Sequence, residues 1–270
     1  MIGCLSLARE TFDIEFAKKK LVKTKKILKK LNKNIRFFDD LITNDKIGGD
    51  AVNFFNKINC SRFIVIQSTF TDAKFISSFI KKFKKPILFV SFKEKRAGGR
   101  LRLNSLCGIN LALHALIKNK FYSNFIIYSN NEEAFTKEIL KFAQNKTFFK
   151  KINYLKKLSN SKKIQKHSIE FKQPKIGIIG ERPEGFDTCD FNSKELKTKF
   201  NAKLANFNLE KLFDIASNIE KKTINLTKKN ISNNLKNLNK LNQKELNKSI
   251  SLFHGLEKLH EKEKIDAFAV

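Results

Sequence analysis

Arginine is scarce in this lysine-rich chain, and its distribution singles out one stretch. Only seven of the 55 basic residues are arginines, and Arg96, Arg100 and Arg102 all lie in "EKRAGGRLRLNSLCGIN" (Glu94–Asn110), with three of the ten glycines. A planar guanidinium can donate two parallel hydrogen bonds to a pair of oxygens, which a lysine ammonium cannot do. The double glycine permits a positive φ or a close backbone approach. The stretch therefore has the chemistry of a ligand-binding loop, or of a tight turn fastened by ion pairs.

Three other loops also carry polar residues other than lysine. They are "ARETFD" (Ala8–Asp13), "QSTFTD" (Gln67–Asp72) and "ERPEGFDTCD" (Glu181–Asp190), and each follows a short apolar run. In open parallel sheets, ligands bind beyond the carboxyl ends of the strands, in loops of this kind. We also expect Asn104 or Ser105 to cap the helix that follows the arginine-rich stretch.

The elements that must position these loops alternate between strands and helices. Helical spacing of apolar residues follows most of the apolar runs, as in Ile14–Leu31. The expected strands are Ile2–Leu7, Ile35–Ile42, Arg62–Thr69, Pro86–Phe92, Asn124–Ser129, Lys175–Gly180 and Ile265–Val270. This alternation predicts an α/β protein with two consecutive open, mostly parallel, Rossmann-like or flavodoxin-like three-layer units, the second incomplete. We place the domains at 1–170 and 171–270.

Composition narrows the classes of function. The net charge of +29 comes from lysines spread along the whole chain, so we expect a solvated surface and no nucleic-acid partner. No run approaches the roughly 20 apolar residues of a membrane helix, so no membrane partner is expected. The four cysteines are isolated, which favours reduced thiols and a cytoplasmic location. His254 and His260 lie six residues apart, which does not place them on one helical face for a shared metal.

Four strings resemble a known family. "CLSLARETFD", "QSTFTDA", "RAGGRLRLNSLCGINLALHAL" and "IGIIGERPEGFDTCDF" together look like the N-terminal half of the L-fucose/L-arabinose isomerase superfamily, closest to its L-fucose isomerase-like group. The resemblance extends over nearly the whole chain. It implies a metal-dependent aldose–ketose isomerase, of which this chain would be the N-terminal part, inactive alone.

The resemblance also implies a cofactor, a set of contacts and an assembly. Mn²⁺ would bridge two sugar oxygens, with ligands expected beyond Val270 and none assigned here. Arg9 would donate to sugar hydroxyls, and Phe70 would close the pocket. Gln67, Arg96 and Arg100 would line neighbouring loops. The substrate would be a monosaccharide, and the N-terminal domains would build a homo-oligomer, a trimer or a hexamer.

Two functions from different classes stay open at this point. The chain is the N-terminal part of the isomerase, or it is a non-catalytic sugar-binding or regulatory α/β module. For either function we expect Arg96–Ser105 to lie at a subunit contact, because arginine is enriched and lysine depleted at interfaces.

Overall fold

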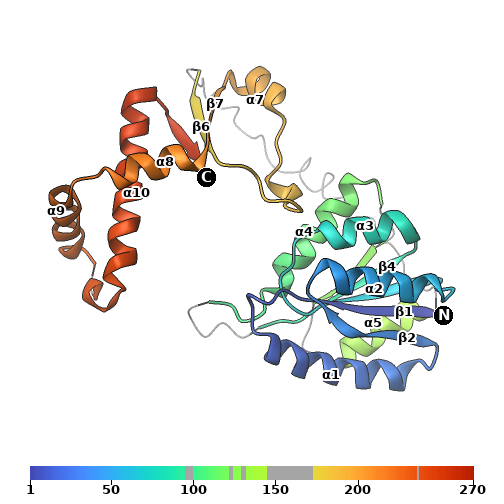
Figure 1. Cartoon of the computed structure of the whole chain (residues 1–270). Coiled ribbons are helices and arrows are strands. Elements are labelled where there is room, and N and C mark those ends of the chain that lie inside the picture. The colour runs from blue at the N-terminus through green and yellow to red at the C-terminus, as the bar shows by residue number, and fades with distance from the viewer. Residues whose placement is uncertain (95–99, 122–123, 129–131, 145–172, 236) are drawn as a thin grey trace, which may run out of the picture. The chain divides into compact units, whose positions relative to one another are not determined.

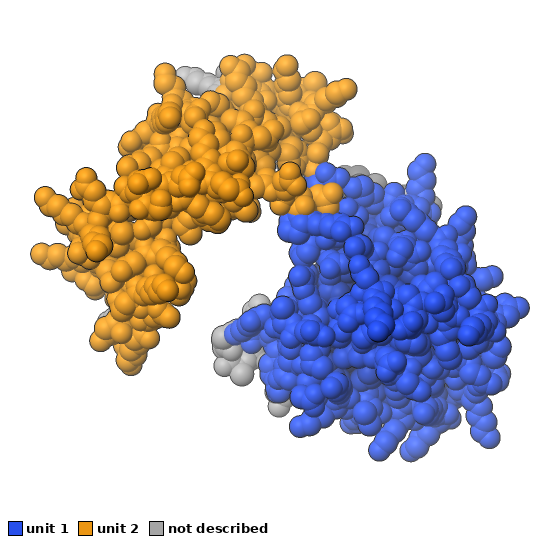
Figure 2. Space-filling view, in the orientation of Figure 1, with its two compact units in different colours: residues 1–160, 183–190 blue, residues 161–182, 191–270 orange. Residues whose placement is uncertain are grey.

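A computed structural model describes residues 1–94, 100–121, 124–128, 132–144, 173–235 and 237–270. The chain forms two compact units (Figure 2). Unit 1 comprises Met1–Asn160 together with Pro183–Asp190, and unit 2 comprises Ser161–Arg182 and Phe191–Val270. The boundary expected at residue 170 falls outside the described residues and stays a prediction.

Unit 1 is a five-stranded parallel sheet with helices on both faces, in the strand order β2-β1-β3-β4-β5 (Figure 1). Its elements are β1 (Ile2–Leu7), α1 (Ile14–Leu31), β2 (Ile35–Ile42), α2 (Asp45–Asn56), β3 (Arg62–Gln67), α3 (Lys74–Phe83), β4 (Ile87–Ser91), α4 (Ser105–Lys118), β5 (Asn124–Tyr128), α5 (Glu132–Ala143) and the short η1 (Asp187–Cys189). This is the flavodoxin-like order, in which the first strand lies inside the sheet.

Two hydrophobic clusters cover the two faces of this sheet. Residues of α2, α3 and α4 pack with Leu5, Phe63 and Phe89 on one face. Residues of α1 and α5 pack with Cys4 and Ile64 on the other. Every residue of β1, β3 and β4 is buried, as expected for parallel strands covered on both sides.

Unit 2 has a smaller parallel sheet in the order β7-β6-β8. Its elements are β6 (Lys175–Ile179), α7 (Ser193–Phe200), β7 (Lys203–Phe207), α8 (Leu209–Ser217), α9 (Lys221–Ser232), η2 (Leu238–Lys240), α10 (Gln243–Glu263) and β8 (Ala267–Ala269). The core lies between the sheet and the helices α8 and α10, around Ile179, Leu212 and Leu259. The two-unit α/β fold expected from the sequence is confirmed.

The structure corrects some element boundaries. The sequence also predicts a helix over Gly48–Ile58. The observed α2 begins earlier, at Asp45, because the Asn44 side chain accepts a hydrogen bond from the Ile47 amide and caps the helix. The last strand is only Ala267–Ala269. β7 was not expected, since its residues alternate without a buried apolar run. The spacing of Asn130 and Glu133 predicts a capping box for the helix that follows, but Asn130 lies outside the described residues.

Candidate functional site of unit 1

The loops after β1 and β3 meet at one edge of the unit 1 sheet. The chain moves from β1 to one side to form β2, and then returns to the other side of β1 to form β3. Such a reversal of strand order leaves a crevice at the carboxyl ends of the strands, where open α/β sheets bind ligands. Arg9 follows β1 and Phe70 follows β3, so the fold brings these two sequence-predicted residues to this edge.

Backbone bonds fix the two loops against each other. The Ser68 amide donates to the Leu7 carbonyl at 2.8 Å. The Arg9 amide donates to Thr69 Oγ1 at 2.7 Å. The position of Arg9 is therefore set by its main chain, which leaves its side chain available for another contact.

Gln67 is fully buried, and its side chain forms hydrogen bonds to the loop after β3. Its Nε2 donates to the Thr69 carbonyl at 2.7 Å and to Thr71 Oγ1 at 2.9 Å. Gly108 makes room for it, because a Cβ at Gly108 would lie 2.8 Å from that nitrogen. The Gln67 Oε1 atom is buried and has no partner in the described part of the chain. Gln67 thus holds the loop that carries Phe70.

Phe70 lies in a row of three half-buried rings. Its centroid is 5.8 Å from that of Phe12 and 5.8 Å from that of Phe186. Its amide donates to the Leu103 carbonyl at 2.7 Å. Tilted rings at this spacing attract one another. Phe70 therefore joins the loops after β1, β3 and β4 to Pro183–Asp190.

The described arginines of the double-glycine stretch contact the loop after β1. Arg102 donates to Asp13 Oδ2 from Nε at 2.9 Å and from a terminal nitrogen at 2.7 Å. Asp13 also accepts from the Phe16 amide at the start of α1, and these bonds, the Phe16 amide foremost, lower the pKa of its carboxyl. Arg100 donates to the Thr11 carbonyl at 3.1 Å. Arg102 thus forms a structural ion pair with Asp13. Arg96 lies outside the described residues.

The prediction of a side-chain cap at the start of α4 is wrong. Asn104 occupies the N-cap position with φ 51°, but its side chain makes no capping bond. The Ser105 hydroxyl bonds instead to the Gln67 carbonyl and to Ser91 Oγ, both in the sheet. The carboxylate of Glu94 accepts from the amides of Leu103 and Asn104, so it orders the end of the loop.

A cavity of about 240 Å³ lies beside these loops. Its polar lining comes from the ends of β1 and β2 and the start of α3, and includes Arg9, Asp45, Asp72 and Lys74. Lys74 contacts Asp45 at 3.2 Å and Glu184 at 3.4 Å. The bond to Asp45, followed by that to Glu184, raises the pKa of Lys74.

Arg9 differs from Lys74 in having no such partner. Across the described ranges, no hydrogen bond or ion pair to its guanidinium is found, and its side chain is exposed. The cavity therefore offers one available guanidinium beside two carboxylates, which suits a ligand with several hydroxyl or oxyanion groups.

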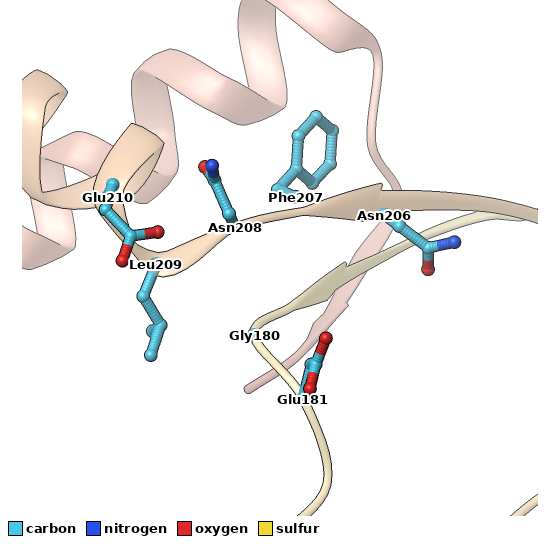
Figure 3. Close-up of a pocket in the computed structure, with 7 residues that line it drawn as sticks. All are labelled: Gly180, Glu181, Asn206, Phe207, Asn208, Leu209 and Glu210. Carbon is cyan, nitrogen blue, oxygen red and sulfur yellow. The ribbon is translucent and has the colours of Figure 1, made fainter.

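Unit 2 has a cavity of its own at the equivalent edge of its sheet. It encloses about 740 Å³ and is lined by Gly180, Glu181 and the Asn206–Glu210 segment. Figure 3 shows Gly180 and Glu181 where β6 ends, and Asn208 to Glu210 where β7 leads into α8. Gly180 has φ +77°, which favours glycine. The carboxylates and amides here can accept hydrogen bonds from a polyol.

Neither a metal centre nor a membrane-spanning helix is found among the described residues. Within them, no group of three His, Cys, Asp or Glu side chains is placed to hold a metal ion. They also include no helix that is both long and apolar enough to cross a bilayer. The described residues therefore include no set of side chains that would hold the manganese ion that the resemblance implies for the complete enzyme.

Sequence reasoning missed several residues of the unit 1 edge. Asp45 and Lys74 stand at helix starts and read as ordinary surface charges, and Phe186 lies beyond β6 in sequence. Their positions after strands β2, β3 and β6 were the available signal, since each falls at a carboxyl end.

Comparison with known proteins agrees with this geometry. Residues 3–153, more than half of the chain, match the fucose/sulfoquinovose isomerase N-terminal domain. Sulfoquinovose isomerases of Priestia aryabhattai and Priestia megaterium are each 28% identical over 211 residues, which are 77% of this chain and 42% of each relative. That of Alkalicoccus urumqiensis is 32% identical over 157 residues, which are 58% of this chain and 31% of the relative.

The chain spans less than half the length of these relatives. The matched region contains β1 to β5 and the loops that carry Arg9, Gln67 and Phe70. It therefore contains the whole described edge around the cavity, apart from Pro183–Asp190. By this match, the chain belongs to the fucose/sulfoquinovose isomerase N-terminal domain family.

Proposed function

We propose that this chain is the N-terminal portion of a metal-dependent aldose–ketose isomerase, and that the unit 1 edge binds part of the sugar. The observation that carries the proposal is the guanidinium of Arg9. It has no partner among the described residues and lines the cavity at the strand-order reversal. Membership of the isomerase family gives that guanidinium a ligand class, since sugars present many hydroxyl oxygens.

The lining suits an aldose in its balance of donors and acceptors. Arg9 supplies donors, whereas Asp45 and Asp72 supply acceptors for sugar hydroxyls. A sulfonated hexose would add an anion that Arg9 can bind with two parallel hydrogen bonds. Both neutral and sulfonated aldoses are therefore candidate ligands for this edge.

Catalysis in this proposal depends on groups other than the residues described. In the complete isomerase, Mn²⁺ would act as a Lewis acid toward the sugar oxygens. We place its ligands, and the catalytic base, outside the described residues. This chain would bind sugar without converting it.

We further propose that a second copy of the chain completes the site. A volume of about 240 Å³ lies below the roughly 300 to 1,000 Å³ of ordinary ligand pockets. The Arg96–Ser105 loop remains our candidate for the subunit contact. Replacing Arg100 by Lys would keep the charge and lose the planar fork, and sedimentation should then detect weaker assembly.

Binding of candidate sugars tests the proposal directly. L-Fucose and sulfoquinovose would be titrated into the chain by calorimetry, with Arg9→Met compared to Arg36→Met. Arg36 is an exposed arginine at the start of β2, away from the carboxyl edge. Loss of a charge-assisted hydrogen bond should weaken binding by roughly ten- to a hundredfold in Arg9→Met. Arg36→Met should bind as the unaltered chain does.

Three results would count against the proposal. If neither sugar binds, the sugar site is rejected. Conversion of an aldose by this chain with Mn²⁺ would show that its own residues suffice for catalysis. Sugar binding by a complete gene product that converts no aldose would favour the non-catalytic sugar-binding module.

A further inference from the structure

Pro183–Asp190, here called the strap, lies in unit 1 although it is flanked in sequence by β6 and α7 of unit 2. The Ala73 amide donates to the Gly185 carbonyl at 3.1 Å. Gly185 has φ +81°, and a Cβ there would lie 3.0 Å from Asp72. The strap therefore contacts the backbone where the loop after β3 enters α3.

One aromatic residue of the strap contacts the candidate site. Phe186 is half-buried against the core cluster of unit 1, and its ring lies 5.8 Å from Phe70. Phe70 has Phe12 as its other ring neighbour. Among the described residues, Phe186 therefore supplies one of the two ring contacts that hold Phe70.

Three carboxylates of the strap contact two lysines. Asp190 is 2.7 Å and Asp187 is 3.9 Å from the Lys118 ammonium at the end of α4. Glu184 is 3.4 Å from the Lys74 ammonium at the cavity. These side chains are partly exposed, so each pair is weak and sensitive to salt. The ring contact and the Ala73–Gly185 hydrogen bond are the parts of the attachment that salt does not screen.

We propose that the strap is a positioning element of the sugar site. Phe186 would orient Phe70, and Glu184 would hold Lys74 at the cavity beside Arg9. The sugar part of this inference rests on the proposed function. The motif "PEGFDTCD" (Pro183–Asp190) would then act in unit 1, although its neighbours in the sequence belong to unit 2.

Amide hydrogen exchange tests the positioning without any ligand. The reporters are the amides of Phe70, bonded to Leu103, and Ala73, bonded to Gly185. Phe186→Ala should speed exchange at both by about tenfold, because a ring contact and its burial are lost. The matched control is Phe191→Ala, an exposed phenylalanine just outside the strap. Neither variant should change exchange in β3, which reports that unit 1 remains folded.

A charge exchange tests the ionic part of the attachment. Lys118→Asp should speed exchange at Ala73, and the double variant Lys118→Asp with Asp190→Lys should restore it. High salt should reproduce the single variant. Unchanged exchange at Phe70 and Ala73 in both Phe186→Ala and Lys118→Asp would overturn the inference, as would faster exchange throughout β3.

Sugar titration then separates this inference from the proposed function. If the unaltered chain binds an aldose, Phe186→Ala should weaken binding by roughly two- to tenfold, while Phe191→Ala does not. Equal affinities in the two variants would overturn the positioning role. If the unaltered chain binds neither L-fucose nor sulfoquinovose, the proposed function fails. The exchange rates at Phe70 then decide by themselves whether the strap positions that residue.

Discussion

In both units the first strand lies inside its sheet, between two neighbours, and carries a glycine beneath a phenylalanine ring of one neighbouring strand. Gly3 of β1 pairs with Phe63 of β3, and Gly177 of β6 pairs with Phe268 of β8. The two rings differ in their surroundings. Phe63 is completely buried, whereas Phe268 is only partly buried.

The same contrast extends to the whole of each sheet. Helices cover both faces of the unit 1 sheet, while in unit 2 α8 and α10 form the core and α7 contributes no buried residue. In the described part of the chain, nine of the fourteen exposed large hydrophobic residues belong to unit 2, although it is the smaller unit. Parallel sheets are normally buried on both faces. The described residues of unit 1 meet that condition, and those of unit 2 do not.

The largest expected effect is on the reactivity of a thiol inside unit 1. Burial raises the pKa of Cys4 to about 12 from its ordinary value of 9.0. The reactive thiolate should therefore be about a thousandfold rarer at pH 8 than for an ordinary thiol. Alkylation followed by mass spectrometry should label the exposed Cys107 and Cys189 first. Rapid labelling of Cys4 in the folded chain would show that the unit 1 core opens as readily as an exposed loop.

Truncation of one strand phenylalanine in each unit tests the difference in core depth. Phe89 in β4 is fully buried, whereas Phe207 in β7 is partly exposed. Phe89→Ala should destabilise unit 1 by about 3 to 5 kcal/mol, and Phe207→Ala should cost unit 2 roughly half as much.

Because the two units need not unfold together, amide exchange should be followed separately in β3 and β6. Equal losses of stability in Phe89→Ala and Phe207→Ala would contradict the difference in core depth between the units. A loss of exchange protection in β3 caused by Phe207→Ala would also contradict it.

The two sheet glycines allow a closer comparison of the two units, because each glycine lies beneath a phenylalanine ring. A Cβ at Gly3 would come within 2.5 Å of Phe63, and one at Gly177 within 2.8 Å of Phe268. Gly3→Ala should cost about 1 to 3 kcal/mol, since the buried Phe63 ring cannot move without disturbing Phe55 and Phe79. Gly177→Ala should cost less than about 1 kcal/mol, because Phe268 can shift toward solvent.

Thermal unfolding followed by exchange in each sheet measures both glycine variants. The control is Gly49→Ala, where a Cβ would meet nothing within 4 Å inside α2. That change should stabilise by roughly 0.5 to 1 kcal/mol. A Gly177→Ala cost as large as that of Gly3→Ala would mean that unit 2 is packed as tightly as unit 1.

Patterns within a few residues were enough to predict most of this architecture. The continuous apolar runs of β1, β3 and β4 indicate strands covered on both faces, and all three are buried. β7 escaped prediction because Lys203 and Asn206 interrupt it, and its pairing with β6 is what makes it a strand. Local sequence patterns therefore predicted the strands of unit 1 better than those of unit 2, where less of each strand is buried.

The candidate site was predictable in place but not in its contacts. The family resemblance, together with the loops after parallel strands, pointed to Arg9, Gln67 and Phe70, whose roles in sugar binding stay predictions. Arg102 and Asp13 are 89 residues apart in sequence, and no local pattern pairs them. The strap likewise depends on tertiary contacts across more than 70 residues, such as Lys118 with Asp190.

The smallest expected effect is the response of one ion pair in each unit to acid. Asp13 in unit 1 and Glu263 in unit 2 both have a lowered pKa, the first mainly through the Phe16 amide and then Arg102, the second through Lys211. A carboxyl whose pKa is lower in the folded state stabilises the fold above its unfolded pKa, and this contribution is lost as pH falls through the folded value. Both units should therefore lose stability below about pH 4, near the ordinary values of 3.8 and 4.5.

Lys211→Met should reduce this acid response in unit 2 and leave that of unit 1 unchanged. Arg102→Met should do the reverse, and only in part, because the Phe16 amide still favours the charged form of Asp13. Both pairs are solvent-exposed, so the differences should shrink in high salt. Exchange protection measured in β3 and β6 between pH 3 and 6 follows each unit separately. If each variant changed the acid response of both sheets, the units would unfold as one body, and the contrast between a self-sufficient unit 1 and an incompletely covered unit 2 would not describe their stability.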